Sequence, residues 1–249
     1  MADHAKQPAV RDAKQKSRTA FDRQAPDYDG TGYGRHARRL HADVMAAVAG
    51  FAFTDVLDVG CGTGATLAAV LETGPGVRAT GIDLSPGMVA VARARLGDRA
   101  RLEVADAEHL PAGDASFDLV LCVDSFHHYP HPEEALAEMR RVTRPGGGLV
   151  VGEWRVNRAV RPLMNWLLPR LPEGDVRIYT PAELTRLAAA AGYAVDRCVP
   201  AGVRGQLLVA RRGAPGRRPK SSPRPPRPIP WGTGSADGRG RDAGRCEHG

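Results

Sequence analysis

The sequence VLDVGCGTGA at residues 56–65 decides the fold. Its first four residues are mostly apolar and partly β-branched, which predicts a short strand buried on both faces. Gly60, Gly62 and Gly64 can adopt backbone angles closed to other residues, and they leave no Cβ in the path of a ligand. The helix expected over residues 65–72 presents free N–H groups and its positive dipole end to this turn. The turn therefore suits a nucleotide-like or anionic ligand, although a glycine-rich loop without any ligand shows the same pattern.

Further strands and helices are expected on both sides of this stretch. We predict strands over residues 55–59, 78–82, 100–105, 117–123, 148–153, 193–199 and 206–210, and helices over residues 35–49, 65–72, 86–96, 133–142 and 181–191. Because strand and helix alternate, the sequence predicts an α/β fold with a parallel sheet and helices on both faces. Ligands on such sheets bind beyond the carboxyl ends of the strands.

The net charge of +7 is carried by one end of the chain. Residues 211–249 hold the whole excess and are rich in Pro, Gly, Arg and Ser, so we expect a disordered basic tail there. Residues 20–210 are the expected folded domain, and residues 1–19 the expected polar, basic N-terminal arm, either loosely ordered or a short surface helix. Positive and negative charges balance over residues 1–210, so no nucleic-acid surface is expected on the folded domain.

Several classes of protein are disfavoured by what the sequence lacks. No apolar run of about 18 residues is present, so no transmembrane segment is expected. The N-terminus is polar and does not resemble a secretion signal. The four cysteines form no C-x-x-C pair, which argues against a structural zinc site or a disulfide framework and fits a cytoplasmic protein.

Acidic residues stand at the predicted carboxyl ends of neighbouring strands. Asp83 can accept hydrogen bonds from both hydroxyls of a ribose, or it can stabilise the N-terminus of the following helix. Asp106, with the backbone of Ala107, can accept from an exocyclic amino group on a purine, or it can cap its own turn. Asp58 lies inside a strand, so its charge needs backbone amides or a ligand ammonium as partners. Asp124 follows the fourth strand. Because the carboxyl ends of parallel strands lie at one edge of the sheet, the glycine turn, Asp83, Asp106 and Asp124 should converge on one crevice.

Three histidines follow Asp124, but we predict no metal site there. Adjacent histidines such as His127 and His128 are expected to point in different directions, and no carboxylate completes a ligand set with them or with His131 at a usual spacing. His127 or His128 is instead a candidate general base for a substrate hydroxyl, because imidazole titrates near neutral pH. A histidine packed under the loop is an equally good interpretation of either residue.

Taken together, these motifs resemble those of the class I S-adenosylmethionine-dependent methyltransferases, in particular the small-molecule branch that includes quinone-biosynthesis C-methyltransferases. The resemblance covers about residues 20–210. It rests on VLDVGCGTG at 56–64, GIDLSPGM at 81–88, ADAEHLP at 105–111, FDLVLCV at 117–123 and EMRRVTRPGG at 138–147, with the segment from Phe21 to Asp29 as an N-terminal match.

The resemblance implies a Rossmann-like seven-stranded sheet of order 3-2-1-4-5-7-6, mostly parallel, with the last strand antiparallel. It also implies binding of S-adenosylmethionine by residues from each motif. The methionine part would contact Gly60, Cys61, Gly62 and Gly64, and its amine would lie near Val123 and Asp124. Asp83 would bind the ribose. Leu84 and Met88 would flank the adenine, and Asp106 and Ala107 would contact the amino group of the adenine. Tyr28 would close over the cofactor.

A small-molecule acceptor is the predicted substrate. DSFH at residues 124–127 departs from the Asp/Asn-Pro-Pro-aromatic motif of nucleic-acid amino-methyltransferases, and no Pro-Cys nucleophile is present. Residues 155–177 are the expected lid, with Leu163, Met164, Trp166 and Leu167 as the apolar wall of the substrate pocket. A helix packed on the sheet edge and a membrane-surface segment are alternatives for this region.

Two other functions stay open on the sequence. One is a NAD(P)-dependent oxidoreductase that uses the same glycine turn. The other is a non-catalytic S-adenosylmethionine-binding protein whose basic tail binds RNA. The sequence does not give the oligomeric state, the acceptor, or whether O, N or C is methylated.

Overall fold

The computed structural model describes residues 7–213. The predicted disordered tail therefore lies almost wholly outside the described residues. Among residues 7–213, no helix combines the length and the apolar character that crossing a membrane would require.

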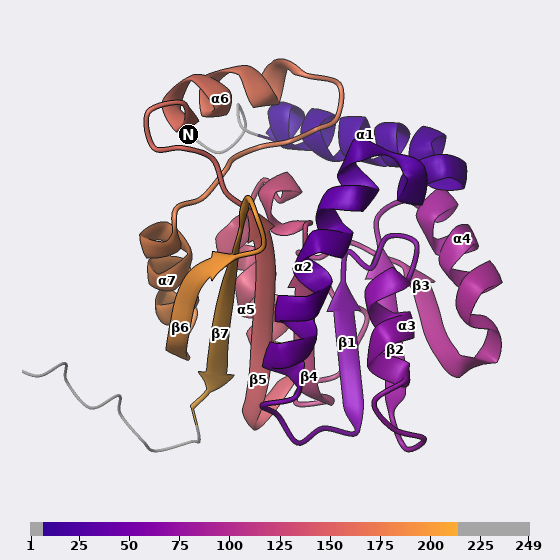
Figure 1. The fold of residues 1–249 in the computed structure, drawn as a ribbon. Helices are drawn as coiled ribbons and strands as arrows, with labels where there is room; N and C mark the ends of the chain where they lie inside the picture. Colours follow the sequence, from indigo (N-terminus) through magenta and orange to yellow (C-terminus); the bar gives the residue numbers. More distant parts are fainter. Residues whose placement is uncertain (1–6, 214–249) are drawn as a thin grey trace, which may run out of the picture. The chain divides into compact units, whose positions relative to one another are not determined.

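A single seven-stranded sheet forms the centre of the described chain (Figure 1). Its strands are β1 (Asp55–Val59), β2 (Arg78–Asp83), β3 (Ala100–Val104), β4 (Phe117–Val123), β5 (Thr143–Trp154), β6 (Tyr193–Ala201) and β7 (Gly205–Arg212). The order is β3-β2-β1-β4-β5-β7-β6. Neighbours from β3 to β5 are parallel, and β7 is antiparallel to both β5 and β6. The predicted fold class and strand order are confirmed.

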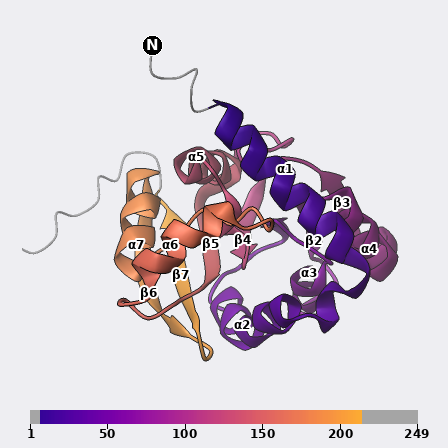
Figure 2. The ribbon, with the colours of Figure 1, turned by 90° about the horizontal axis from the view of Figure 1, so that it is seen from above.

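Helices and short 3-10 turns connect these strands. The helices are α1 (Gln7–Gln24), α2 (Gly32–Val48), α3 (Ala65–Leu71), α4 (Pro86–Leu96), α5 (Pro132–Val142), α6 (Arg161–Leu167) and α7 (Pro181–Ala190). The 3-10 turns are η1 (Ala25–Gly30), η2 (Gly97–Arg99), η3 (Phe126–His128) and η4 (Leu168–Arg170). Seen from above, α2 and α3 lie on one side of the sheet and α5 on the other (Figure 2).

Both faces of the sheet are buried, which explains the continuous apolar runs in its central strands. In β4, Leu119 and Leu121 join a core cluster with residues of α2, α3 and α4. The alternating residues Val120 and Cys122 join a second cluster with residues of α5 and α7. Side chains of a strand alternate between faces, so a strand covered on both sides must be apolar at every position.

Local capping signals place two of the helices as predicted. The Ser85 hydroxyl accepts a hydrogen bond from the Met88 amide at 3.0 Å and caps α4, with Pro86 at the first helical position. Thr180 and Glu183 form a reciprocal capping box at the start of α7. Gly192 has φ of +89° directly after that helix. Such residues satisfy the free backbone groups at helix ends.

The described part of the N-terminal segment is helical. Residues 7–24 form one helix, α1, which continues through the boundary expected at residue 19. Ser17 and Ala20 are buried on its inner side, and the ammonium of Lys14 lies 2.6 Å from Asp106 Oδ2. Figure 1 shows α1 beyond the carboxyl ends of the parallel strands. This segment therefore belongs to the wall of the site described next.

Candidate functional site

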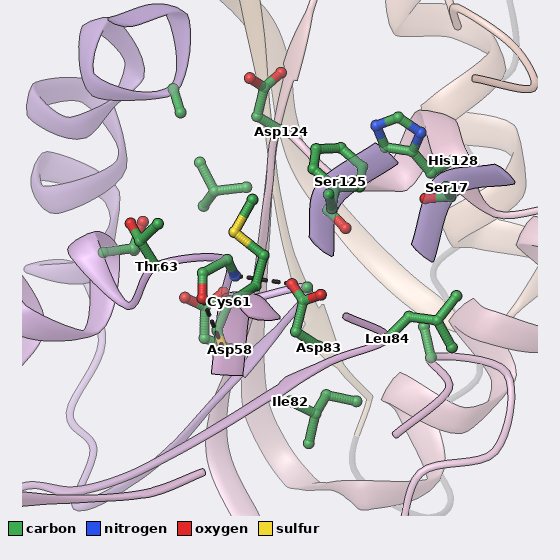
Figure 3. Close-up of a pocket in the computed structure, with 18 of the residues that line it drawn as sticks. Ser17, Asp58, Cys61, Thr63, Ile82, Asp83, Leu84, Asp124, Ser125 and His128 are labelled. Carbon is green, nitrogen blue, oxygen red and sulfur yellow. Dashed lines mark hydrogen bonds between the residues drawn. The ribbon is translucent and has the colours of Figure 1, made fainter. Parts of the chain in front are cut away.

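A cavity opens at the carboxyl ends of β1, β2 and β4 (Figure 3). Twelve of the thirteen residues predicted to bind a cofactor line this cavity. They are Tyr28, Asp58, Gly60, Cys61, Gly62, Asp83, Leu84, Met88, Asp106, Ala107, Val123 and Asp124. The structure thus brings together positions up to 96 residues apart in the sequence. Gly64 is outside this lining and serves as the N-cap of α3, with φ of +76°.

The glycine turn is held against the neighbouring strand by its backbone. The amides of Gly60 and Cys61 both donate to the Ile82 carbonyl at 2.9 Å. Gly60 and Gly62 have φ of +73° and +52°, in the left-handed region that other residues rarely occupy. This conformation exposes the turn to the cavity and leads directly into α3.

Asp83 joins two parts of the site. Its Oδ2 accepts a hydrogen bond from the Gly62 amide and its Oδ1 one from the Ser85 amide, each at 2.9 Å. Burial raises the pKa of Asp83 to about 6, while these two backbone hydrogen bonds limit the rise. The Leu84 amide also donates to this carboxylate, and the remaining lone pair can accept from a ligand hydroxyl. Both predicted roles, ribose acceptor and stabiliser of the α4 N-terminus, are therefore compatible with its position.

Asp58 carries an unpartnered oxygen into the cavity wall. The side chain is buried, and its Oδ1 has no hydrogen-bond partner among the described residues. Burial, with the nearby charge of Asp83, raises the pKa of Asp58 to about 7. An unpaired buried carboxylate is costly, and a cationic ligand group would compensate for its charge. The donors expected from the glycine turn do not reach this oxygen.

Asp106 already has partners within the protein. Its Oδ1 accepts from the Glu108 amide at 3.0 Å, and its Oδ2 from the Lys14 ammonium at 2.6 Å. Of its two predicted roles, the structure shows the capping of its own turn. Lys14 also contacts Glu108, so an adenine amino group would have to share these carboxylates with the lysine.

The two candidate bases have opposite environments. His127 Nδ1 donates to Glu153 Oε2 at 2.8 Å, and its Nε2 lies 3.4 Å from Asp175 Oδ1. Burial alone would lower the pKa of His127, but the charge and hydrogen bond of Glu153, together with Asp175 and Asp124, raise it to about 10. His127 is therefore charged at neutral pH, and it does not line the cavity.

His128 is the neutral member of the pair and lines the cavity. Burial and the adjacent charge of His127 hold the pKa of His128 well below its usual value. Its Nδ1 is buried and lies 3.3 Å from Asp175 Oδ1, although this contact does not have the geometry of a hydrogen bond. A neutral imidazole beside the cavity can accept a proton, so only His128 has the protonation state of a base.

One reason for expecting no metal is wrong. The rings of His127 and His128 lie side by side, with centroids 4.1 Å apart. Asp175, far away in the sequence, adds a carboxylate, and the three residues offer ligand atoms within 4.8 Å of one another. Hydrogen bonds and charge already engage His127 with Glu153 and Asp175, and the absence of a metal stays a prediction.

The predicted substrate wall is not part of this cavity. Leu163, Met164, Trp166 and Leu167 belong to α6, which lies beyond the carboxyl ends of the strands (Figure 1). None of the four is among the residues that line the cavity. Their role as a substrate wall, and that of residues 155–177 as a lid, stay predictions.

Sequence reasoning missed cavity residues from the N-terminal helices. Lys14 and Ser17 come from α1, and Arg38 and His41 from α2. The pattern in α2 was interpreted only for its apolar face, which packs on the sheet. Positions 37, 38 and 41 follow one another at helical spacing along the flank of this apolar face, and that spacing is the signal that could have found them.

The sheet order, the glycine turn and the acids at successive strand ends define a Rossmann-like nucleotide-binding protein. Residues 57–151 match the family model described as a methyltransferase domain. The demethylmenaquinone methyltransferase of Renibacterium salmoninarum is 41% identical over 140 residues, which cover 54% of this chain and 56% of that protein. That of Tropheryma whipplei is 37% identical over 169 residues, with 62% of this chain and 67% of that protein covered. The chain therefore belongs to the class I S-adenosylmethionine-dependent methyltransferases.

A solved structure agrees over most of the chain. The 1,6-didemethyltoxoflavin-N1-methyltransferase of Burkholderia thailandensis, with bound 1,6-didemethyltoxoflavin and S-adenosylhomocysteine, is 25% identical with a TM-score of 0.58. The match covers 86% of this chain and 91% of that one. By contrast, the chain spans only about half the length of the Renibacterium relative. Membership of this family removes the basis for the oxidoreductase alternative.

Proposed function

We propose that the chain transfers a methyl group from S-adenosylmethionine to a small apolar or aromatic metabolite, at an oxygen or a carbon atom. The observation that carries the proposal is the cavity in which Asp83, the glycine turn and the unpartnered Asp58 meet. We place the ribose on Asp83 and the ammonium group of the methionine part near Asp58. The cofactor carries positive charge on its sulfonium and ammonium groups, which suits these buried carboxylates.

The named relatives support a small-molecule acceptor. Demethylmenaquinone and 1,6-didemethyltoxoflavin are acceptors in the names of the matched proteins, and a 27-O-demethylrifamycin SV methyltransferase of Amycolatopsis mediterranei is 40% identical over 104 residues. We propose an acceptor of this general kind without choosing among these molecules. We also propose a cytoplasmic location, since no disulfide joins the described cysteines Cys61, Cys122 and Cys198.

Methyl transfer from a sulfonium requires mainly alignment of the acceptor, the methyl group and the sulfur, with water excluded. The chain's own contribution would be this alignment. For a hydroxyl acceptor, we propose that His128 accepts the hydroxyl proton, because it lines the cavity and because burial and the charge of His127 lower its pKa and keep it neutral. For an activated carbon acceptor, the base would matter less.

Calorimetry with the full chain tests the cofactor assignment. S-adenosylmethionine should bind and NADH should not. Asp83→Asn should weaken S-adenosylmethionine binding by about tenfold or more, because it removes the charge and one acceptor from the ribose site. Asp98→Asn is the matched control, since Asp98 is exposed on η2. Binding of NADH alone, or equal affinity of the two variants, would overturn the assignment.

The non-catalytic alternative needs a separate experiment. Its basic tail lies outside the described residues, so RNA binding stays a prediction. Methyl-labelled S-adenosylmethionine incubated with metabolite extracts, followed by mass spectrometry of the labelled product, tests for turnover. Deletion of residues 211–249 with salt-dependent RNA binding as the readout tests the tail.

A further inference from the structure

Helix α6 has the reverse of the usual amphipathic arrangement. A surface helix normally turns its apolar face to the core and its polar face to water. In α6, polar Asn165 faces the protein, where its Nδ2 donates to the Ile178 carbonyl at 3.2 Å and its Oδ1 accepts from the Ile178 amide at 2.8 Å. Arg161 also faces inward and binds Glu183 Oε2 at 2.9 Å. These polar contacts fix the helix with its apolar side outward.

The outward side is strongly apolar. Leu163 is 62% exposed, Trp166 is 58% exposed, and Leu167 and the preceding Val160 are also exposed. Four of the seven exposed large hydrophobic residues in the described chain therefore lie within eight positions. Single exposed apolar residues are ordinary, but a contiguous group on one short segment marks a surface that contacts something apolar.

The charge of the surrounding segment indicates what that partner is. Residues 155–172 contain four arginines and no acidic residue. Arg155, Arg158 and Arg170 are exposed, whereas the fourth is neutralised by Glu183. The Arg170 guanidinium lies over the Trp166 ring, 4.3 Å from its centroid. An exposed tryptophan with adjacent leucines and flanking arginines matches the boundary between phosphate headgroups and acyl chains.

We propose that residues 155–171, which we call the α6 surface, bind an anionic phospholipid bilayer. Leu163, Trp166 and Leu167 would enter the headgroup region, and the exposed arginines would contact lipid phosphates. The contact is peripheral, because among residues 7–213 no helix is suited to cross the bilayer. An acidic protein partner would also satisfy the arginines, but it would not account equally well for the contiguous exposed leucines and tryptophan.

The position of the α6 surface connects docking to the site. Figure 1 shows α6 beyond the carboxyl ends of the parallel strands, at the end of the sheet where the cavity opens. The chain then returns to the site, since the amides of Val176 and Arg177 donate to the His127 carbonyl at 2.9 and 3.2 Å. Docking would therefore bring the cavity close to a lipid-soluble acceptor. This last step rests on the proposed function, whereas docking itself does not.

Flotation with vesicles tests the proposal on the full chain. Vesicles of phosphatidylcholine containing phosphatidylglycerol should bind the protein, with weaker binding at high salt. The double variant Leu163→Ser with Trp166→Ser should reduce partition by about tenfold. The matched control is Val203→Ser, which also removes an exposed apolar side chain, 77% exposed, but in the β6–β7 connection. The affinity for S-adenosylmethionine, measured by calorimetry, should be unchanged in both variants. Failure of membrane docking can therefore be told apart from failure of the proposed function.

Fluorescence distinguishes insertion of the α6 surface into the bilayer from electrostatic attraction of the basic tail to the lipid headgroups. Bromine-labelled acyl chains should quench part of the tryptophan emission in the native chain, and Trp166→Phe should lose that quenched part. The proposal is overturned if the native chain and the Trp166→Phe variant are quenched equally. It is also overturned if the serine double variant and Val203→Ser bind vesicles to the same extent. A third contrary result would be light scattering that shows two copies of the chain joined through the α6 surface, with no vesicle binding.

Discussion

Gly60 and Gly62 both have positive φ, but only Gly60 is also restricted by its neighbours. A Cβ on Gly60 would lie 1.9 Å from Ser125 Oγ and 2.6 Å from Ser125 Cβ, whereas a Cβ on Gly62 would meet nothing within 4 Å. The first glycine is thus required by conformation and by close packing of the β1 and β4 ends. The second is required by conformation and leaves room beside the turn.

We therefore expect different losses of stability from the two alanine variants. Gly62→Ala should lower the free energy of unfolding by about 1–2 kcal/mol, the cost of a left-handed residue with a Cβ. Gly60→Ala should lower it further, because Ser125 must move as well. Urea unfolding measures both, and Gly74→Ala, with no neighbour within 4 Å of its Cβ, is the control. Equal losses at Gly60 and Gly62 would contradict the packing argument.

His128 provides a second prediction at the scale of one residue. If the acceptor is a hydroxyl, His128→Gln should lower kcat by about a hundredfold or more, the usual contribution of a general base. S-adenosylmethionine affinity should change little, because the charged contacts of the cofactor are assigned to Asp58 and Asp83. His131→Gln is the comparison variant, since His131 is half-exposed and absent from the cavity lining. An unchanged kcat in His128→Gln would rule out the base.

Among the elements, α7 depends on a local motif that can be tested directly. Thr180 Oγ1 accepts from the Glu183 amide at 3.2 Å, and Glu183 Oε2 accepts from the Thr180 amide at 2.8 Å. The same glutamate binds Arg161 and thus also positions α6. The capping box therefore stabilises one helix by itself and a second helix through an ion pair.

We expect Thr180→Ala to lower the free energy of unfolding by about 1 kcal/mol, because one helix amide loses its acceptor. Arg186→Ala, an exposed position inside the same helix, should change stability by less than about 0.5 kcal/mol. Guanidinium unfolding curves compare the two variants. A loss in Arg186→Ala as large as that in Thr180→Ala would show that α7 is not limited by its cap.

At the scale of the whole molecule, the sheet and most of the cavity lining were predictable because their signals are local. Strand periodicity, the glycine turn and the acids at strand ends each occupy a few consecutive residues, and parallel topology brings the carboxyl ends to one edge. The capping box and Gly192 are local in the same way. These features need no knowledge of distant contacts.

The N-terminal helix was harder to predict for a physical reason. Its inner side carries few large apolar residues, and Lys14 is held by Asp106, 92 positions away. A polar contact between residues so far apart in the sequence leaves no periodic pattern, so the sequence predicted only a loosely ordered arm or a surface helix here and not a wall of the cavity. The Asp175 carboxylate beside His127 and His128 escaped notice for the same reason. The inverted face of α6 is likewise set by Asn165 and Arg161, whose partners are visible only in the folded chain.

The buried charges of the site predict how stability depends on pH. His127 has a pKa raised to about 10 in the folded protein, compared with about 6.5 when unfolded. The contribution of His127 to the free energy of unfolding is complete below the unfolded pKa and is lost as the pH rises toward the folded pKa. The lowered pKa values of His36, His41 and His128 leave these residues neutral in both states above about pH 7.5.

Between about pH 7.5 and 8, where most thiols of the unfolded chain are still protonated, the free energy of unfolding should therefore fall with rising pH. His127 should contribute about 1.4 kcal/mol per pH unit to the slope, which corresponds to one proton released on unfolding. Asp58 and Asp124, whose pKa values burial raises to about 7, should add a smaller part that fades as the pH rises. Urea unfolding at several pH values measures the slope. His127→Gln should reduce the slope by about 1.4 kcal/mol per pH unit whatever its overall stability, and His131→Gln should keep the native slope. A native slope near zero, or an unchanged slope in His127→Gln, would mean that Glu153 and Asp175 do not hold a charged imidazole between them.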